Sequence, residues 1–344
     1  MSMTSRYRIK GEIGAGGMGR VNLASIDGPD GFQWIAIKRP RKRLAHDQLA
    51  VKGFVEEGRI AARISHPNVA SVVEVGEDDE GWFIAMEYLH GEPLREIARH
   101  LEKRGERMSP KIACRILCDA AEGLHAAHEL GVVHRDVTPH NLFVTYDGAT
   151  KVFDFGVATP ESAGACGLKG KLAYMAPEQI GAGPVDRRAD VFALGVVAWE
   201  LTTGQRLFRG KDDGETLENV LRGEVPRPTT FIANYPAELE QIILTALSPN
   251  ADDRFPTARA FARAIQLMLM GRGEIVSQRD VAAFLRAAVP ERIAERDAAL
   301  RAQHEEDEAE LTVTDPTIAV CAVPPPATIS GHARTCPMVY KMSA

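Results

Sequence analysis

The 344-residue chain has no long apolar run, no paired cysteines and no strong excess of either charge. Its most apolar stretch, Val191 to Leu201, is far shorter than the roughly 20 residues that a membrane-spanning helix needs. The five cysteines are scattered without a C-x-x-C pair, which argues against a zinc ribbon or a disulfide framework. The net charge of −6 gives no general reason to expect a nucleic-acid partner, and the first dozen residues lack the apolar core of a secretory signal. We therefore expect a cytoplasmic protein in a reducing compartment, with no membrane contact.

What the chain does contain is an ordinary globular composition, with 45% hydrophobic residues, and a change of pattern along its length. Its length suggests two domains, or one large enzyme with an extension. Residues 6–90 hold short β-rich runs separated by Gly/Asp turns. Residues 94–270 have helical patterns, apart from strand-like pieces at 142–144 and 151–153. One or two surface helices are expected over residues 277–303, and a disordered tail after them.

A glycine-rich segment lies between two strand-like runs near the start of the chain, and consists of Gly14, Ala15, Gly16, Gly17, Met18 and Gly19, followed closely by Val21. Dinucleotide-binding folds share such glycines, but there a helix follows, whereas a strand follows here. Lys38 ends the next strand-like run. Glycines let backbone amides approach phosphate oxygens, and a nearby ammonium neutralises them. The combination favours phosphate binding over the alternative of a tight hairpin and a surface lysine.

A lysine that points at phosphates needs an orienting partner, and a helical pattern from Leu49 to Ile64 offers two carboxylates. Glu56 and Glu57 are neighbours, so their side chains point about 100° apart on a helix and only one can face Lys38. We select Glu57 as the partner. The resulting ion pair would link the position of the helix to the position of the lysine.

Two aspartates and an asparagine lie at short spacing within the mainly helical region: Asp136, Asn141 and Asp154. Asp136 can orient a hydroxyl and accept its proton, while Asn141 and Asp154 can hold a divalent metal between phosphates, since Mg²⁺ needs few protein oxygens. Hydrolysis by paired carboxylates is the rival interpretation. It accounts for neither the glycines nor Lys38, whereas metal-assisted phosphoryl transfer accounts for all of them.

These segments together resemble the signature set of the protein kinases, and in particular the bacterial, eukaryotic-like Ser/Thr protein kinases. The matching segments, in order, are Gly14–Val21, Lys38, Glu57, His134–Asn141, Asp154–Gly156 and Ala176–Glu178. The resemblance covers about residues 7 to 270. It implies a bilobal α+β fold, with a small antiparallel sheet and one helix at residues 7–88 and a mainly α-helical lobe at residues 89–270. The remaining pattern predicts a helical extension at 271–310 and a disordered tail at 311–344.

The resemblance also implies ATP as a substrate and Mg²⁺ as a cofactor, with Mn²⁺ as an alternative ion. By similarity, adenine would contact Met86 as gatekeeper, the backbones of Glu87 and Leu89, and the side chains of Val21, Ala36 and Phe143. Two further roles come only from the resemblance. Asp190 would anchor the catalytic loop and Arg254 would pair with Glu178, where helix capping or surface charge would otherwise be the preferred interpretation.

Two positions depart from the family pattern. The family usually carries lysine two residues after the catalytic aspartate, where this chain has Thr138, and threonine where this chain has Lys171. We hypothesise that the two residue types have exchanged places, with Lys171 supplying the ammonium and Thr138 the hydroxyl, because a flexible lysine can deliver a point charge from either side. A catalytically weak pseudokinase that acts as an ATP-binding scaffold is the alternative.

Substrate and regulation follow from the same resemblance. Serine or threonine in protein substrates is the expected acceptor, with autophosphorylation and a role in bacterial signalling. Thr159 and Ser162 are candidate phosphorylation sites whose phosphate could dock on Arg135, although a solvated loop hydroxyl is the simpler interpretation of each. Threonines in the tail, such as Thr312, could recruit a phosphothreonine-binding partner, against a strong prior of chance threonine content.

Overall fold

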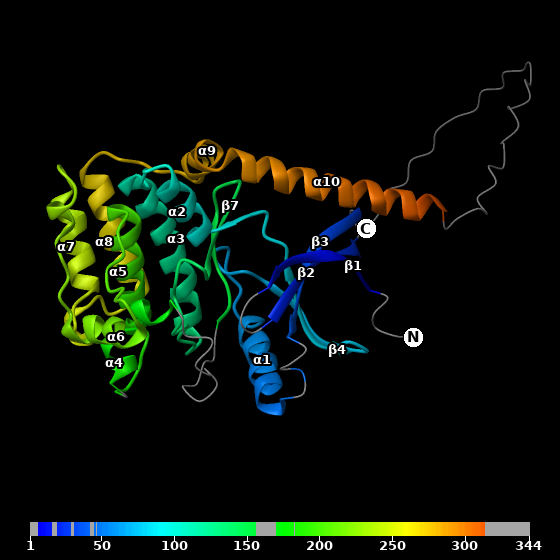
Figure 1. The fold of residues 1–344 in the computed structure, drawn as a ribbon, viewed down its shortest axis with the longest axis horizontal. Coiled ribbons are helices and arrows are strands. Elements are labelled where there is room, and N and C mark those ends of the chain that lie inside the picture. The colour runs from blue at the N-terminus through cyan, green and yellow to red at the C-terminus, as the bar shows by residue number, and fades with distance from the viewer. Residues whose placement is uncertain are drawn as a thin grey trace, which may run out of the picture. The chain divides into compact units, whose positions relative to one another are not determined.

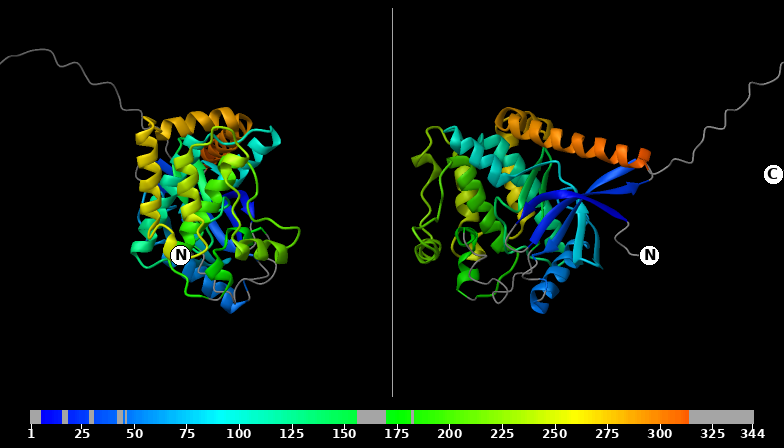
Figure 2. Two further views of the ribbon diagram at one scale, coloured as in Figure 1. Left: turned by 90° about the vertical axis from the view of Figure 1, so that its left-hand side faces the viewer. Right: turned by 45° about the vertical axis from the view of Figure 1, so that its right-hand side comes forward.

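The computed structural model describes residues 6–15, 19–28, 31–41, 45, 47–155, 170–181 and 183–313. Figure 1 shows a β-sheet with one helix next to a larger, mainly helical lobe, and the turned views of Figure 2 show the same division. The strands are β1 (Tyr7–Ala15), β2 (Gly19–Gly28), β3 (Gly31–Pro40), β4 (Val72–Asp78), β5 (Gly81–Glu87), β6 (Gly91–Pro93), β7 (Leu142–Thr145) and β8 (Thr150–Val152). The α-helices are α1 (Gln48–Ala61), α2 (Leu94–Lys103), α3 (Pro110–Glu129), α4 (Pro177–Ile180), α5 (Arg188–Thr203), α6 (Asp213–Arg222), α7 (Ala237–Ala246), α8 (Ala258–Gly271), α9 (Gln278–Ala288) and α10 (Pro290–Val313). Short 3₁₀ turns lie at Leu172–Tyr174, Pro228–Thr230 and Ala251–Asp253.

The N-terminal lobe is an antiparallel sheet in the order β1-β2-β3-β5-β4, with α1 packed on β4 and β5. The side chain of Asp47 begins α1 by accepting hydrogen bonds from the backbone of Leu49 and Ala50, which satisfies two of the free N–H groups at the helix start. β4 begins only at Val72. The preceding Val69 instead forms a parallel bridge with Val152 of β8, so this segment belongs to the junction with the second lobe.

The C-terminal lobe is built around α5, whose residues from Ala189 to Thr203 are all buried. A helix that is apolar on all sides needs neighbours on all sides, and α3, α7 and α8 supply them. The small sheet β6-β7-β8 lies at the edge of this lobe that faces the first one. The predicted bilobal α+β fold is confirmed, and it places the segments that resemble kinase motifs at the junction of the lobes.

Beyond α8 the chain forms two further helices. α9 begins at a capping box in which Ser277 and Asp280 exchange side-chain and backbone hydrogen bonds, and its apolar face packs on α2 and α3. α10 continues to Val313, three residues into the segment predicted as a disordered tail. Residues 1–298 form one compact unit and residues 299–344 a second. Among the residues that the structure describes, no helix is long and apolar enough to cross a membrane.

Candidate active site

Lys38 lies in β3, with Val21 of β2 and Ile84 of β5 opposite it across the sheet. Its Nζ lies 2.8 Å from Glu57 Oε1 and 2.9 Å from Asp154 Oδ1. Burial by itself would lower the pKa of the Lys38 ammonium, but the negative charges of Asp154 and Glu57 outweigh burial and raise that pKa. Lys38 is therefore a buried cation that joins α1 to the segment after β8.

The rotation of α1 decides which of the two neighbouring glutamates reaches Lys38. Glu57 is buried and bonded to the lysine, whereas Glu56 is exposed. Gly58 allows the helix to approach the sheet, because a Cβ at that position would lie only 2.8 Å from the side chain of Ile84. Burial raises the pKa of the Glu57 carboxyl, and the charge of Lys38 opposes that shift. The expected Lys38–Glu57 pair is thus present.

Asp190, at the start of α5, holds the backbone of the segment His134–Asn141, the predicted catalytic loop. Its carboxylate accepts hydrogen bonds from the N–H groups of His134 and Arg135, each at 2.8 Å. Its Oδ2 also lies 2.7 Å from Nε2 of His128 on α3. Arg135 has a φ of 62°, a left-handed conformation that costs a non-glycine residue about 1–3 kcal/mol. The buried aspartate therefore stabilises the strained turn that directly precedes Asp136.

Asn141 lies next to Asp136. Its Nδ2 donates hydrogen bonds to the backbone O of Asp136 at 2.8 Å and to the carboxylate Oδ2 at 2.9 Å. The backbone O of Asn141 accepts a hydrogen bond from Phe153, which brings the next residue, Asp154, to the same place. Asp154 has a φ of 56°, and its Oδ1 bonds to Lys38. The structure therefore brings Asp136, Asn141 and Asp154 together with the lysine.

Lys171 also points at this group of residues. Its Nζ lies 2.5 Å from Oδ2 of Asp136, and its side chain is 40% exposed. Thr138 is buried, and its hydroxyl accepts a hydrogen bond from the backbone of His140 at 3.3 Å. An ammonium thus meets Asp136 from the segment before α4, whereas the threonine stabilises the turn of the catalytic loop.

The predicted phosphate loop is described only at its two ends. Gly14 pairs with Val21 and Ala15 with Arg20, whereas Gly16, Gly17 and Met18 lie outside the described residues. At Gly19, a Cβ would lie 2.5 Å from the backbone O of Arg39, so only glycine allows β2 to approach β3 there.

The residues expected to contact adenine come from strands of both lobes and from the segment after β5. Ala36 of β3 lies opposite Met86 of β5. The carboxylate of Glu87 accepts hydrogen bonds from Nζ of Lys151, on β8, at 2.7 and 2.9 Å. Its side chain therefore joins β5 to the second lobe, while its backbone continues toward Leu89. Phe143 lies on β7, in the other lobe. These residues therefore come from β2, β3, β5, β7 and the segment after β5, and their contact with adenine stays a prediction.

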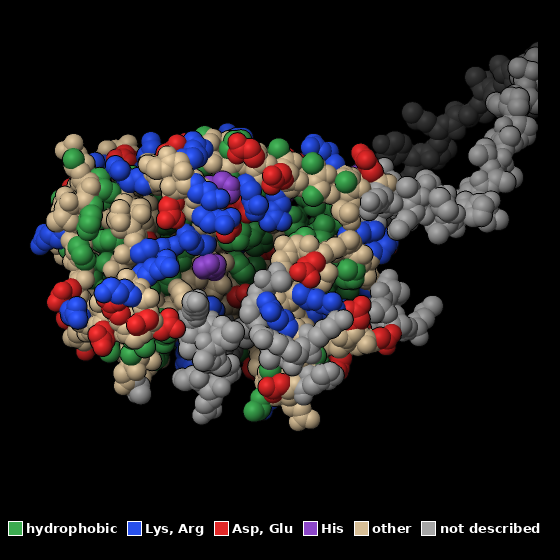
Figure 3. All heavy atoms as spheres, in the orientation of Figure 1, with side chains coloured by type: hydrophobic (Ala, Val, Ile, Leu, Met, Phe, Trp, Pro, Cys, Tyr) green, Lys and Arg blue, Asp and Glu red, His purple; other side chains and the backbone are tan. Residues whose placement is uncertain are grey.

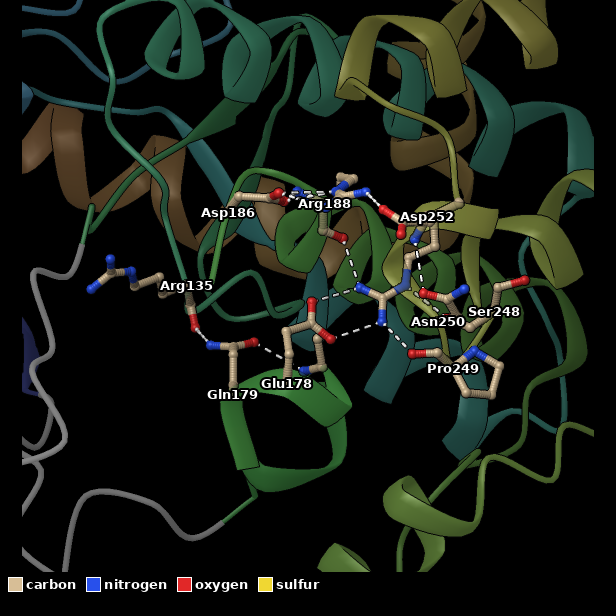
Figure 4. Close-up of polar contacts among 11 residues, drawn as sticks. Arg135, Glu178, Gln179, Asp186, Arg188, Ser248, Pro249, Asn250 and Asp252 are labelled. Atoms are coloured by element: carbon tan, nitrogen blue, oxygen red, sulfur yellow. Dashed lines mark hydrogen bonds and ion pairs between the residues drawn. The ribbon is translucent and has the colours of Figure 1, made fainter. Parts of the chain in front are cut away.

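Glu178 and Arg254 form the expected pair, drawn in Figure 4. Arg254 donates hydrogen bonds to Glu178 Oε1 at 2.7 Å and Oε2 at 2.8 Å, and its guanidinium is fully buried. The neighbouring Gln179 was not singled out by sequence reasoning. Its amide donates to the backbone O of Arg135 at 3.0 Å, so α4 is tied to the catalytic loop. No local signal distinguishes this glutamine from a surface residue.

The two candidate phosphorylation sites, Thr159 and Ser162, lie outside the described residues. Nothing in the described part of the chain therefore bears on their contact with Arg135.

Comparisons with known proteins agree with this geometry. A family model described as protein kinase domain matches residues 7–264. The chain is 40% identical over 278 residues to the tyrosine-protein kinase MasK of Myxococcus xanthus, covering 76% of this chain and 43% of that protein. It is 34% identical over 260 residues to the serine/threonine-protein kinase PrkC of Bacillus subtilis, covering 74% and 39%. The chain thus spans less than half the length of these two relatives.

A solved structure, the PknI kinase domain of Mycobacterium tuberculosis, matches with a TM-score of 0.59 and 28% identity over 77% of this chain and 96% of that one. Sequence, fold and the family match over most of the chain point the same way. The chain belongs to the protein kinase family.

Proposed function

We propose that this chain transfers the γ-phosphate of ATP to serine or threonine hydroxyls of protein substrates. The observation that carries the proposal is the double contact of Lys38, which bonds to Glu57 and Asp154 at once. In protein kinases, a lysine paired with a helix glutamate positions the phosphates of ATP. Transfer also requires the metal-binding aspartate to be in place at the same time. The intact set argues against the alternative of a pseudokinase scaffold.

The proposed step needs a base for the acceptor hydroxyl. Asp136 would orient the hydroxyl and accept its proton as the substrate oxygen bonds to the γ-phosphorus. The bond from that phosphorus to the β–γ bridging oxygen breaks, and ADP leaves. Asn141 holds the carboxylate of Asp136 in position, and Lys38 would balance the charge of the phosphates.

The donor set fits a Mg²⁺ ion, with Mn²⁺ as an alternative. Asn141 spends its amide nitrogen on Asp136, which leaves its amide oxygen as a ligand, and Asp154 has a second carboxylate oxygen besides the one on Lys38. Within the described ranges, no group of three or more His, Cys, Asp or Glu side chains could hold a metal without other ligands. This suits an ion that takes its remaining ligands from phosphates and water. When bound, Mg²⁺ would supply positive charge that neutralises the phosphates.

Lys171 would replace the lysine that the family usually carries in the catalytic loop. Its Nζ lies at Asp136 although its backbone lies 35 residues away along the chain. An ammonium at this place can stabilise the charge on the phosphoryl group during transfer, from whichever segment it comes. The hydroxyl of Thr138 is bonded to the backbone of His140 instead. The contact of Lys171 with Asp136 supports the proposal that Lys171 supplies the ammonium. Thr138 instead stabilises the backbone turn at His140.

Phosphate transfer from radiolabelled ATP to a generic basic protein tests the proposal. Asp136→Asn should abolish labelling, because no base remains at the hydroxyl. Lys171→Ala should lower kcat by about 100-fold, the effect expected of one lost transition-state contact. The exchanged pair Thr138→Lys with Lys171→Thr should recover part of this loss. Equal labelling by the wild type and Asp136→Asn would defeat the kinase proposal, and full activity of Lys171→Ala would defeat the exchange.

The acceptor residue needs a separate measurement. PrkC is named a serine/threonine kinase, whereas the name of MasK favours tyrosine as the second candidate. Acid hydrolysis of labelled substrate, followed by separation of phosphoserine, phosphothreonine and phosphotyrosine, distinguishes the two. We expect phosphothreonine or phosphoserine.

Autophosphorylation in bacterial signalling is proposed on the same basis. Phosphate on Thr159 or Ser162 would dock on Arg135, and phosphate on a tail threonine would recruit a phosphothreonine-binding partner. Mass spectrometry of the purified chain after incubation with Mg-ATP tests both sites. An active enzyme without phosphate at any of these positions would contradict this part of the proposal.

A further inference from the structure

A buried carboxylate lies in the segment that connects the two lobes. Glu92 belongs to β6 and lies in residues 88–92, the hinge that follows β5 and leads into the second lobe; its side chain is buried, with 1% of the residue exposed. Its Oε1 and Oε2 accept hydrogen bonds from Arg292 at 3.1 and 2.9 Å, and Oε1 also accepts one from the hydroxyl of Tyr146 at 2.8 Å. Arg296 lies one helical turn further along α10, with its Nε 3.5 Å from the same carboxylate. Two arginines of α10 therefore hold one glutamate of the hinge.

A second contact joins α10 to the same segment. Nε2 of His90 lies 2.9 Å from Oδ1 of Asp297. The ring of His90 packs edge-on against Tyr146 at 4.9 Å between centroids, and its backbone O accepts a hydrogen bond from Tyr146. In Figure 3, Lys and Arg side chains gather around a histidine beneath the first half of α10.

The two arginine partners of Glu92 come from outside the part of the chain that matches the kinase family. That match ends at residue 264, whereas Arg292 and Arg296 lie on α10. A buried carboxylate without a cation is strongly unfavourable, so the burial of Glu92 depends on these arginines. Bidentate arginine contacts also fix the direction of the carboxylate as well as neutralising it.

The clamped segment is continuous with the proposed adenine-binding elements. Glu92 pairs with Val144 and the next residue, Pro93, with Phe143. Side chains alternate along a strand, so Glu92 points away from the face that carries Phe143. Gly91 keeps the strands tightly apposed, since a Cβ there would lie 2.2 Å from the backbone O of Val144. A displacement of Glu92 would therefore move the strand beneath the proposed adenine site.

We propose that Arg292 and Arg296 are positioning residues for ATP, because they clamp residues 88–92 through Glu92 and so fix the backbone that binds adenine. The inference rests on the proposed function only in taking ATP as the ligand of the junction. The clamp acts on adenine, which is remote from the transferring phosphoryl group. Its loss should therefore weaken nucleotide binding and raise KM for ATP, with kcat little changed.

The test uses the full chain and isothermal titration with Mg-ADP, which needs no phosphotransfer. The double variant Arg292→Gln with Arg296→Gln should weaken ADP binding about tenfold, within the range of coupling energies carried by such networks. The matched control is Arg286→Gln, on the exposed face of α9, and should bind ADP like the wild type. Hydrogen exchange of the amides in residues 86–92 should be faster in the double variant than in the control.

A variant that folds poorly is replaced by Arg292→Lys, which keeps the charge but loses the bidentate contact, and should bind ADP with intermediate affinity. Coupling is measured with Glu92→Gln, Arg292→Gln and their combination, whose effects on ADP affinity should not add. The clamp is overturned if a folded double variant binds ADP within twofold of the wild-type affinity. If the double variant does not fold, the same result for Arg292→Lys overturns it. A wild type that binds ADP but labels no protein overturns the proposed function alone, and one that binds no ADP overturns both.

Discussion

Replacement of Arg254 by alanine tests how far a buried ion pair supports the helical lobe. The Arg254 guanidinium has no exposed surface and bonds to both oxygens of Glu178 (Figure 4). It also donates to three backbone O atoms, those of Ser248, Pro249 and Arg188. Its charge lies over the ring of Phe192, 4.9 Å from the centroid, as a further stabilising contact.

The expected loss is large because the partners remain after the arginine is removed. Deleting one partner of a buried ion pair destabilises a protein by about 3–5 kcal/mol, since the other charge is left uncompensated. Glu178 is only 17% exposed, so water compensates it incompletely. We expect Arg254→Ala to lower the free energy of unfolding by about 4 kcal/mol. At about 2–4 °C per kcal/mol for a domain of this size, the Tm falls by about 10 °C.

Thermal unfolding followed by circular dichroism measures the shift, with Arg259→Ala as the control. Arg259 also pairs with a glutamate, Glu122, at 3.0 Å, but its side chain is 57% exposed. Exposed pairs contribute about 0–1 kcal/mol, so the control should lower the Tm by less than about 3 °C. Similar shifts in the two variants would refute the argument that burial, and not the pair itself, determines the contribution. Activity should fall as well, because α4 holds the catalytic loop through Gln179 and Arg135.

Three further predictions follow from the described contacts. Lys38→Met should lower kcat by at least about 100-fold in the protein-labelling assay, because the carboxylates of Glu57 and Asp154 lose the cation between them. Activity close to that of the wild type would contradict this role of Lys38. Cys114 and Cys118 are buried, and burial raises the pKa of the Cys114 thiol to about 12, so mass spectrometry should find iodoacetamide on them at pH 8 only after denaturation. Burial would raise the pKa of the Asp78 carboxyl, but its hydrogen bonds with Arg39 outweigh burial and bring that pKa below its usual 3.8. The pair therefore stabilises the fold above pH 3.8, and this contribution is lost as the pH falls through the lower pKa of the folded state. Asp78→Asn should therefore lose less stability than the wild type as the pH falls below about 4 in acid unfolding, and an acid limb like that of the wild type would count against the pair.

Much of the candidate site could be predicted because its residues lie in short motifs. The order of the segments carrying Lys38, Asp136 and Asp154 indicated the chemistry. Helical rotation implied that only one of Glu56 and Glu57 could face Lys38, and Glu57 was the selected partner. The division into a sheet and a helical lobe followed from side-chain periodicity. These features depend on neighbours a few residues apart, and local patterns carry that information.

Other features depended on contacts between distant segments, which no local pattern contains. Glu92 follows a glycine in a short polar segment and resembles a surface residue, yet it is buried by Arg292, which lies 200 residues away. The bond of Gln179 to the backbone of Arg135 likewise depends on how α4 packs. The contact of Lys171 with Asp136 was a hypothesis until the path of the chain brought the two together. The sequence by itself therefore determined which residues could do the chemistry, whereas the tertiary structure decided which charges are buried together, because burial and pairing arise only when distant elements pack.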